Sequence, residues 1–297
     1  MIRIGLVGAG PWANMFTAPM LAAAPDVSLD VVWARRAEAA VAVADRHGAT
    51  AAGSFEDLLS ACDAVAFTVP PDVQAELAVA AARAGRHLLL EKPVGFTVAA
   101  AEAVAAAADA AGVATQLMLT YRYTDQVRTF LAQAAGARPG YVRVAYFGGG
   151  ALDGSPFATP WRREAQAVLP DLGPHTLDLL EATAGPVAEL RAAEAGEVVT
   201  VTTVHEGGAR GHVAISGTTP GPGGVLEAEA VTTAGRVHLA DPTPYEPGDV
   251  QRTIVGEFVR TVRGEQRQPL DVHHGVRLQR LIAATATAIR TGGAVRP

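Results

Sequence analysis

The first 120 residues alternate short apolar runs with stretches of helical periodicity. The apolar runs predict strands at 2–7, 29–33, 64–69, 87–90 and 115–119. The stretches between them predict helices at 15–24, 37–47, 72–84 and 98–111, and a further helix that begins after Ser54. Strands that alternate with helices of about 10–15 residues form parallel sheets covered on both faces. This part of the chain therefore predicts a doubly wound α/β domain over residues 1–119.

After residue 120 the pattern changes to strands with few helices between them. Strands are expected at 141–147, 198–204, 211–216, 226–232 and 236–239. A helix is expected near Asp171, a Pro-rich loop at 241–248 and a closing helix at 272–291. The pattern indicates a second domain over residues 120–297, of α+β type with an open, mostly antiparallel sheet. A broad sheet face without covering helices predicts pairing with further copies, as a homodimer or homotetramer.

Composition narrows the class of protein further. The 24 basic and 30 acidic residues give a net charge of −6, so no basic nucleic-acid footprint is expected. Apolar runs end well before the roughly 18 residues of a membrane span, and the N-terminus lacks a secretion-signal pattern. Cys62 is the one cysteine, which excludes an internal disulfide framework. We therefore expect a cytoplasmic protein with neither a membrane nor a nucleic-acid partner.

A glycine turn joins the first predicted strand to the first predicted helix. Gly8 and Gly10 with Ala13 give the pattern G-x-G-x-x-A, and Pro11 and Trp12 lie within it. The first glycine permits a tight turn, the second allows close approach of a pyrophosphate, and the alanine allows close helix–strand packing. The pattern favours a dinucleotide site, with a glycine turn that binds no ligand as the alternative.

The end of the second strand bears on which dinucleotide is bound. An acid there would bind a free ribose 2′-hydroxyl, but the sequence has Arg35 and Arg36. A guanidinium suits a 2′-phosphate, so NADP is preferred over NAD. The alternative is that both arginines are solvated surface residues or stack on adenine. Pro70, after the strand at 64–69, is a further expected cofactor contact.

Lys92 is the single lysine among the 24 basic residues. An ammonium has a pKa that burial can lower, whereas a guanidinium stays protonated. Lys92 and Glu91 follow the strand at 87–90, and ligands of open α/β sheets lie beyond the carboxyl ends of strands. We therefore expect Lys92 and Glu91 at the cofactor crevice, with a surface salt bridge between the two as the alternative.

A second chemical segment runs from Asp171 to Asp178. In a helix that begins near Asp171, Pro174 falls in the first turn, and Asp171 and His175 lie on one face. An imidazole beside carboxylates is a good general base. The alternatives are that Asp171 is only an N-cap and that His175 is structural. A metal is not expected, because no complementary Cys or His cluster is present.

Together these residues resemble the glucose–fructose oxidoreductase/inositol dehydrogenase/rhizopine catabolism (Gfo/Idh/MocA) family. The resemblance rests on the glycine turn at Gly8, on Glu91-Lys92-Pro93, and on the Asp171, Gly173, His175 and Asp178 pattern. It implies an N-terminal Rossmann domain and a C-terminal open mixed sheet that mediates dimers or tetramers. It also implies hydride transfer between a nicotinamide and a carbon of a sugar, an inositol or a related polyol.

The resemblance also implies residue roles. His175 takes the hydroxyl proton, Lys92 hydrogen-bonds the reacting oxygen, and Asp171 holds a neighbouring hydroxyl or orients His175. Substrate contacts are implied for Arg122, Trp161 and Arg162, and Asp178 is implied to be structural.

Two departures from the family pattern leave the substrate open. Many members have a glycine pair where this chain has residues 167–170, and the acid after the second strand is absent. Two other readings remain: a glycosidase that holds NAD tightly, and a nicotinamide-binding sensor without catalysis. Retention of Lys92, Asp171 and His175 together argues against the sensor.

Overall fold

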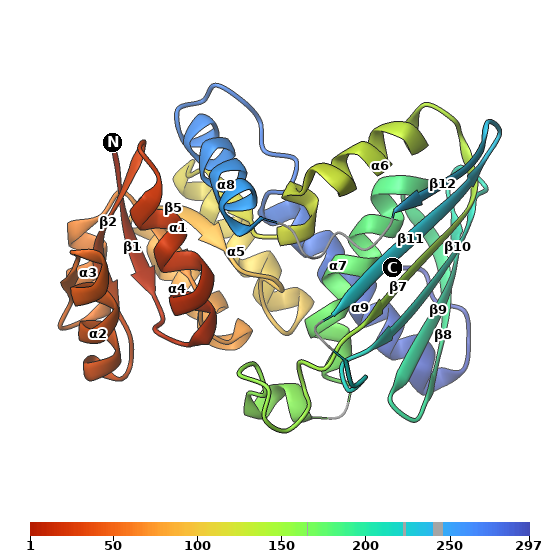
Figure 1. Ribbon diagram of the computed structural model, residues 1–297, viewed down its shortest axis with the longest axis horizontal. Coiled ribbons are helices and arrows are strands. Elements are labelled where there is room, and N and C mark those ends of the chain that lie inside the picture. The colour runs from red at the N-terminus through yellow and green to blue at the C-terminus, as the bar shows by residue number, and fades with distance from the viewer. Residues whose placement is uncertain (165, 222–223, 240–245) are drawn as a thin grey trace. The chain divides into compact units, whose positions relative to one another are not determined.

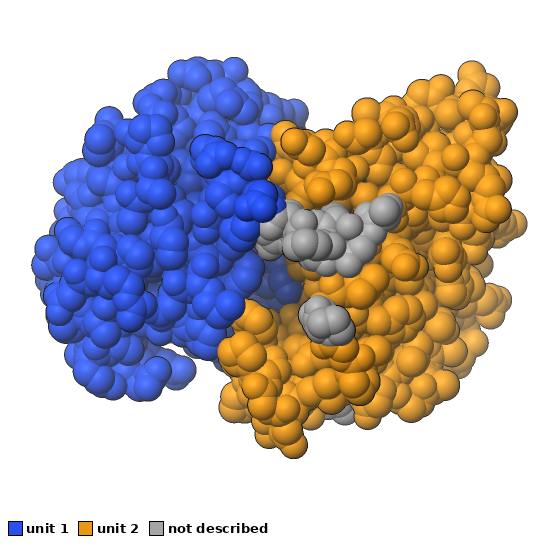
Figure 2. Space-filling view, in the orientation of Figure 1, with its two compact units in different colours: residues 1–118, 246–277 blue, residues 119–245, 278–297 orange. Residues whose placement is uncertain are grey.

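The computed structural model describes residues 1–164, 166–221, 224–239 and 246–297. These residues form two compact units, coloured separately in Figure 2. Unit 1 contains residues 1–118 and 246–277, and unit 2 contains residues 119–245 and 278–297. The functional division at residue 119 expected from the sequence stays a prediction. Among the described helices, none is long and apolar enough to cross a membrane.

Unit 1 is built on a six-stranded parallel sheet in the order β3-β2-β1-β4-β5-β6 (Figure 1). Its strands are β1 (Ile2–Val7), β2 (Val27–Trp33), β3 (Thr50–Ala51), β4 (Ala64–Phe67), β5 (His87–Leu90) and β6 (Thr115–Leu117). All four residues of β4 are buried, as expected for a central strand covered on both faces. This strand order is that of a doubly wound dinucleotide-binding sheet, so the predicted fold class is confirmed.

The helices of unit 1 follow the predicted alternation, with two differences. They are a π-helical turn (Ala13–Thr17) that continues as α1 (Ala18–Ala23), then α2 (Ala37–His47), α3 (Phe55–Ala61), α4 (Pro71–Arg83), α5 (Val98–Ala111) and α8 (Pro247–Val262). Ser54 caps α3, its Oγ accepting the backbone N–H of Asp57 at 3.0 Å. The π-helical turn is the first difference, since a continuous α-helix from residue 15 was expected.

The second difference is α8. The prediction of a Pro-rich loop over 241–248 was wrong for its last two residues, because α8 begins at Pro247. A proline is tolerated at the first position of a helix, where its missing N–H would have no partner within the helix. Residues 241–245 of that loop lie outside the described residues. Val250, Ile254 and Phe258 repeat every four residues and are buried, an apolar stripe that was present in the sequence.

Unit 2 contains the second sheet, in the order β12-β11-β7-β10-β9-β8. Its strands are β7 (Pro139–Phe147), β8 (Val187–Ala195), β9 (Val198–His205), β10 (Arg210–Ser216), β11 (Val225–Thr232) and β12 (Gly235–Leu239). Only the β7–β10 pair is parallel among these described strands, which confirms the mostly antiparallel sheet. The sequence prediction missed β8, because the strand is rich in alanine and glutamate, which are depleted in strands.

Helices cover one face of this sheet. The helical segments of unit 2 are two 3₁₀ turns (Thr120–Tyr123 and Pro160–Arg163), α6 (Asp125–Ala135), α7 (Val168–Ala184) and the part of α9 (Val272–Thr291) from residue 278 onward. Val142 and Val144 of β7 are buried, and α7 packs against this strand. Tyr141 and Arg143 alternate with them and are 38% and 48% exposed, so they lie on the opposite face of the sheet.

Two histidines in the folded units resist protonation. His87 Nδ1 accepts the N–H of Ala114 at 2.9 Å. His205 lies between the Gly185 carbonyl (2.6 Å from Nδ1) and the Thr203 hydroxyl (2.9 Å from Nε2). Burial lowers the pKa of both imidazoles below its usual value.

These shifts predict that the protein is less stable in acid. The unfolded chain binds protons at a histidine pKa of about 6.5, before the two folded histidines do, so the free energy of unfolding falls as the pH drops below that value. Urea unfolding at about pH 7.5 and about pH 5.0, on either side of that pKa, measures the loss. His87→Gln and His205→Gln should each flatten the dependence, while His212→Gln, at a half-buried position of β10, serves as the control. An equally steep loss in both buried-site variants would contradict this assignment.

Candidate active site

The expected cofactor residues of unit 1 meet at one edge of the parallel sheet. Gly8 follows β1, Arg35 follows β2, Pro70 follows β4 and Lys92 follows β5. The strand order reverses between β1 and β4, and crevices that bind dinucleotides form at the carboxyl ends of such strands. The fold thus gathers residues from four separate loops at the place where a dinucleotide would bind.

The two glycines of the turn occupy their positions for different physical reasons. Gly8 has a φ of +110°, and a Cβ there would lie 2.6 Å from the carbonyl oxygen of Thr68. At Gly10 an added Cβ would meet no atom within 4 Å. Gly8 is therefore required by the fold itself, whereas the space at Gly10 is open. Open space beside a glycine backbone fits a bound pyrophosphate.

Two polar residues that the sequence analysis missed brace this turn. Asn14 Nδ2 donates to the carbonyl oxygens of Ala9 at 3.2 Å and Gly10 at 2.9 Å. Arg46, in the last turn of α2, donates to Asn14 Oδ1 at 2.7 Å. The turn carbonyls are therefore fixed by side chains from two helical segments. An amide four residues after Gly10 was the only signal in the sequence.

The other residues predicted at the cofactor site lie as follows. Ala13 is fully buried, as close helix–strand packing requires. Pro11 is exposed and Pro70 half-buried. Arg35 and Arg36 are both exposed, and Arg36 directly precedes α2. Their exposure leaves both guanidinium groups accessible at the end of β2.

Trp12 connects the glycine turn to the segment after β5. Its indole Nε1 donates to Glu91 Oε1 at 2.5 Å, and its ring stacks on Phe16 with centroids 4.6 Å apart. The second carboxylate oxygen, Glu91 Oε2, accepts the backbone N–H of Lys92 at 3.1 Å. Lys92 itself is half-buried. Glu91 therefore ties together two of the three motifs that carry the family resemblance.

The Asp171 segment forms the N-terminal half of α7 in unit 2. The helix begins at Val168, so the expected start near Asp171 was late by one turn. The N–H of Asp171 already donates to the carbonyl of Ala167 at 3.1 Å. Asp171 is therefore not the N-cap, and Pro174 lies inside the helix rather than in its first turn. Asp171, His175 and Asp178 are all buried.

Both carboxylates of this segment are held by arginines. Arg162 donates to Asp171 through Nε at 2.9 Å and NH2 at 3.1 Å, a bidentate geometry. Arg122 donates to Asp178 Oδ1 at 2.7 Å. The Arg162 guanidinium also lies 4.4 Å from the centroid of the Trp161 ring. Of the three expected substrate contacts, Arg122 and Arg162 thus bind the acidic residues of α7, and Trp161 contacts Arg162.

Two tyrosines that the sequence analysis missed border His175. The Tyr121 ring meets the imidazole edge-to-face at a centroid distance of 5.1 Å, and the Tyr146 ring lies at 6.1 Å. Their hydroxyls are 2.9 Å apart. The surroundings of His175 therefore include two aromatic rings with hydroxyl groups, which no sequence motif predicted. Among the described residues, no group of three or more His, Cys, Asp or Glu is arranged to hold a metal ion.

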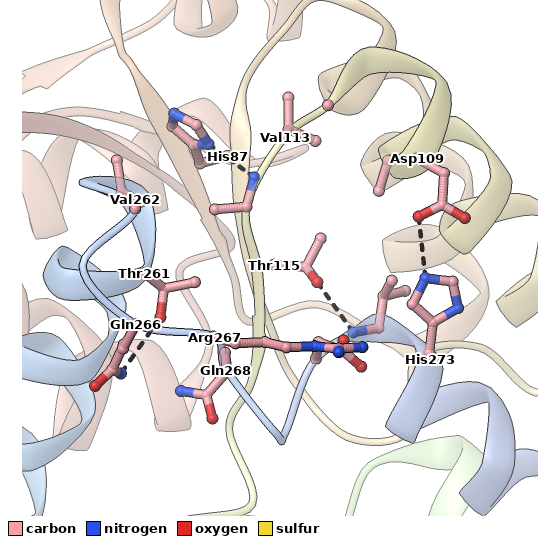
Figure 3. A pocket seen from close by; sticks show the side chains of 16 residues that line it. His87, Asp109, Val113, Thr115, Thr261, Val262, Gln266, Arg267, Gln268 and His273 are labelled. Carbon is pink, nitrogen blue, oxygen red and sulfur yellow. Dashed lines mark hydrogen bonds and ion pairs between the residues drawn. The ribbon is translucent and has the colours of Figure 1, made fainter.

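A pocket elsewhere in unit 1 does not belong to this site. Figure 3 shows it lined by His87 and Thr115, the first residues of β5 and β6, and by His273 and Asp109, whose Nε2 and Oδ1 atoms lie 3.0 Å apart. These residues lie at the amino ends of the strands. The motif residues lie at the carboxyl ends, so the pocket and the candidate cofactor site occupy opposite edges of one sheet.

Comparison with known proteins agrees with the geometry of unit 1. Residues 2–119 match the model of the Gfo/Idh/MocA family, described as an oxidoreductase family with an NAD-binding Rossmann fold. The match covers the first domain and agrees with the family resemblance that the sequence motifs of residues 8–93 carry. A curated relative, dehydrogenase FPY6 of Fusarium mangiferae, is 28% identical over 179 residues, which is 55% of this chain and 51% of the relative. The match thus spans about half the length of that relative.

Solved structures share the whole fold. A putative myo-inositol dehydrogenase from Sinorhizobium meliloti covers 100% of this chain, and 99% of its own, with a TM-score of 0.90 at 16% identity. A levoglucosan dehydrogenase in complex with NADH and levoglucosan covers 99% of this chain, and 98% of its own, with a TM-score of 0.86 at 16% identity. At such identities the likeness establishes the fold.

The two glycines of the turn give a paired prediction. Gly8→Ala should lower the free energy of unfolding by at least about 2 kcal/mol, because the methyl group is strained at positive φ and meets the Thr68 carbonyl. Gly10→Ala should fold with wild-type stability but bind NADH at least about tenfold more weakly, since its methyl group fills the open space.

Gly207→Ala is the matched control, because its Cβ also meets no atom within 4 Å and it lies in unit 2. Urea unfolding and NADH titration measure the two effects. Unchanged NADH affinity in Gly10→Ala would remove the turn from the cofactor site.

Proposed function

We propose that this protein is an NAD(P)-dependent oxidoreductase that transfers a hydride between nicotinamide and a hydroxyl or carbonyl carbon of a sugar, an inositol or a related polyol. The observation that carries the proposal is the set of residues that meet at the carboxyl ends of the parallel strands in unit 1. There the glycine turn, with open space at Gly10, is joined through Trp12 and Glu91 to the chain's single lysine. A nicotinamide dinucleotide supplies the hydride chemistry when bound.

Lys92 and His175 handle the reacting oxygen and its proton in this proposal. The Lys92 ammonium donates a hydrogen bond to the oxygen and stabilises negative charge that develops on it. A ring nitrogen of His175 accepts the hydroxyl proton during oxidation and returns it during reduction. An ammonium and an imidazole are suited to these roles because one is a compact cation and the other titrates near neutral pH.

The carboxylate of Asp171 fits contact with a substrate hydroxyl. A carboxylate accepts hydrogen bonds from hydroxyls as well as from guanidinium groups, and Arg162 donates to both of its oxygens. Arg162 also fixes the direction of the carboxylate on α7. Arg122, held by Asp178, and Trp161 complete the proposed substrate contacts. The names of the two similar solved structures, a putative myo-inositol dehydrogenase and a levoglucosan dehydrogenase, support a polyhydroxylated substrate.

The proposed cofactor is NADP rather than NAD, although the family description names NAD. The support is the absence of an acid at the end of β2 and the exposure of Arg35 and Arg36 there. The proposed assembly is a homodimer or homotetramer through the sheet face that exposes Tyr141 and Val231. A reducing, cytoplasmic setting fits Cys62, whose burial raises the pKa of its thiol to about 11.

The cofactor proposal is tested by titrating the protein with NADPH and NADH and following tryptophan fluorescence. Trp12 lies in the glycine turn and Trp33 ends β2, so quenching should report binding directly. NADPH should bind at least about tenfold more tightly, since a guanidinium–phosphate bond is charge-assisted. The Arg35→Ser/Arg36→Ser variant should lose this preference and keep its NADH affinity. Tighter NADH binding by the wild type would overturn the 2′-phosphate assignment and leave the fold intact.

If neither cofactor binds, the purified protein should be checked for a nicotinamide cofactor that it already holds. Retained NAD without net turnover would favour a glycosidase, and its absence would favour a sensor.

The catalytic assignment is tested with His175→Ala and Lys92→Arg on a panel of sugars and polyols. His175→Ala should slow turnover by about 10²–10⁴-fold while NADPH affinity is kept, because general-base catalysis contributes that much. Lys92→Arg keeps the charge but replaces a compact ammonium with a planar guanidinium, so activity should be lost as well. Wild-type turnover in either variant would remove that residue from the mechanism.

A further inference from the structure

A buried glutamine holds the backbone around Lys92. Gln74 lies in the first turn of α4 and is fully buried. Its Oε1 accepts the N–H of Glu91 at 2.9 Å, and its Nε2 lies 2.8 Å from the Glu91 carbonyl oxygen. The same Nε2 lies 3.1 Å from the carbonyl oxygen of Pro93 and 3.3 Å from that of Val94. One carboxamide therefore binds the main chain on both sides of Lys92.

We propose that Gln74 is a positioning residue for Lys92: by anchoring the residues before and after it, the carboxamide fixes the point and direction from which the lysine stem leaves the main chain. The proposal rests on the role proposed above for Lys92. Gln74 acts through the backbone and has no part in the chemical step itself.

The geometry requires an amide for this role. A carboxamide presents one acceptor and two N–H donors, which here serve one N–H and three neighbouring carbonyl oxygens. A carboxylate could accept from Glu91 but would oppose the carbonyl oxygens, and an apolar side chain would leave all of them unpaired. The backbone of Glu91 is bound at both its N–H and its carbonyl, while its side chain joins Trp12 and the N–H of Lys92. The segment is thus held from α4 on one side and from the glycine turn on the other.

A purely structural role is the competing explanation, because any buried glutamine that satisfies backbone groups stabilises the fold. Gln116 supplies the matched control. It is also fully buried in unit 1, its Nε2 donates to the Ile254 carbonyl at 2.9 Å, and its Oε1 accepts from Gln268 at 2.7 Å. Gln116→Leu makes the same chemical change as Gln74→Leu, at a side chain that is bonded to Ile254 and Gln268 instead of to the Glu91–Val94 segment.

The chain offers a direct probe of Lys92. Because it is the single lysine, protein labelled with ¹³C at lysine Cε gives one lysine signal in an NMR spectrum. In Gln74→Leu this signal should move or split. In Gln116→Leu it should superimpose on the wild-type signal. Gln74→His, whose neutral imidazole offers one donor and one acceptor, should restore the signal in part and keeps the test available if Gln74→Leu does not fold.

Kinetics on the active protein separates positioning from binding. Gln74→Leu should lower kcat by about 10- to 100-fold, the effect of a misplaced catalytic group, with the KM for the cofactor nearly unchanged. The proposal would be overturned if the Lys92 signal and kcat were unchanged in both Gln74 variants. It would also be overturned if Gln116→Leu changed the signal and kcat as much as Gln74→Leu does. The NMR measurement needs no substrate, so it decides the role of Gln74 even if no sugar or polyol is turned over, a result that would instead count against the proposed function.

Discussion

The close approach of the loops that follow β1 and β4 is the constraint on which the candidate cofactor site depends. Gly8 adopts a φ that disfavours side chains, and its α-carbon faces the Thr68 carbonyl at a distance that excludes a methyl group. Thr68 in turn donates its N–H to the Val7 carbonyl at 2.8 Å. This contact brings the ends of two adjacent parallel strands together at the place where strand order reverses, and the glycine turn opens beside it.

Local signals explain why much of unit 1 could be predicted. The helices at 37–47 and 98–111 end at Gly48 and Gly112, which adopt the left-handed conformation that ends helices. Ser54 is an N-cap whose partner lies three residues away. The structure agrees with such elements because each boundary is decided by neighbours in sequence, and the strands between them are continuous apolar runs.

The parts that the sequence could not reveal depend on contacts between distant residues. Gln74 reads as one more polar residue of an alanine-rich helix, and only the packing of α4 beside β5 brings it to residues 17 positions later. The same holds for Tyr121 and Tyr146, which come from a 3₁₀ turn and a strand to meet His175. The start of α7 at Val168 was missed for another reason. Its first two turns contain two prolines, and prolines in a sequence indicate a helix boundary rather than a helix interior.

The role proposed for Lys92 explains why this position has a lysine rather than an arginine. Every other basic residue of the chain is arginine, so charge alone does not explain an ammonium here. A rigid guanidinium has five donors in a fixed plane and suits planar, bidentate partners, such as the Asp171 carboxylate that Arg162 binds. A single reacting oxygen needs one compact donor whose position is set by its attachment point. Gln74 from α4 and Glu91, joined to Trp12, bind the main chain on both sides of that attachment point. The proposed mechanism needs such anchoring, because only a fixed attachment point allows a flexible four-carbon stem to deliver one ammonium to one place.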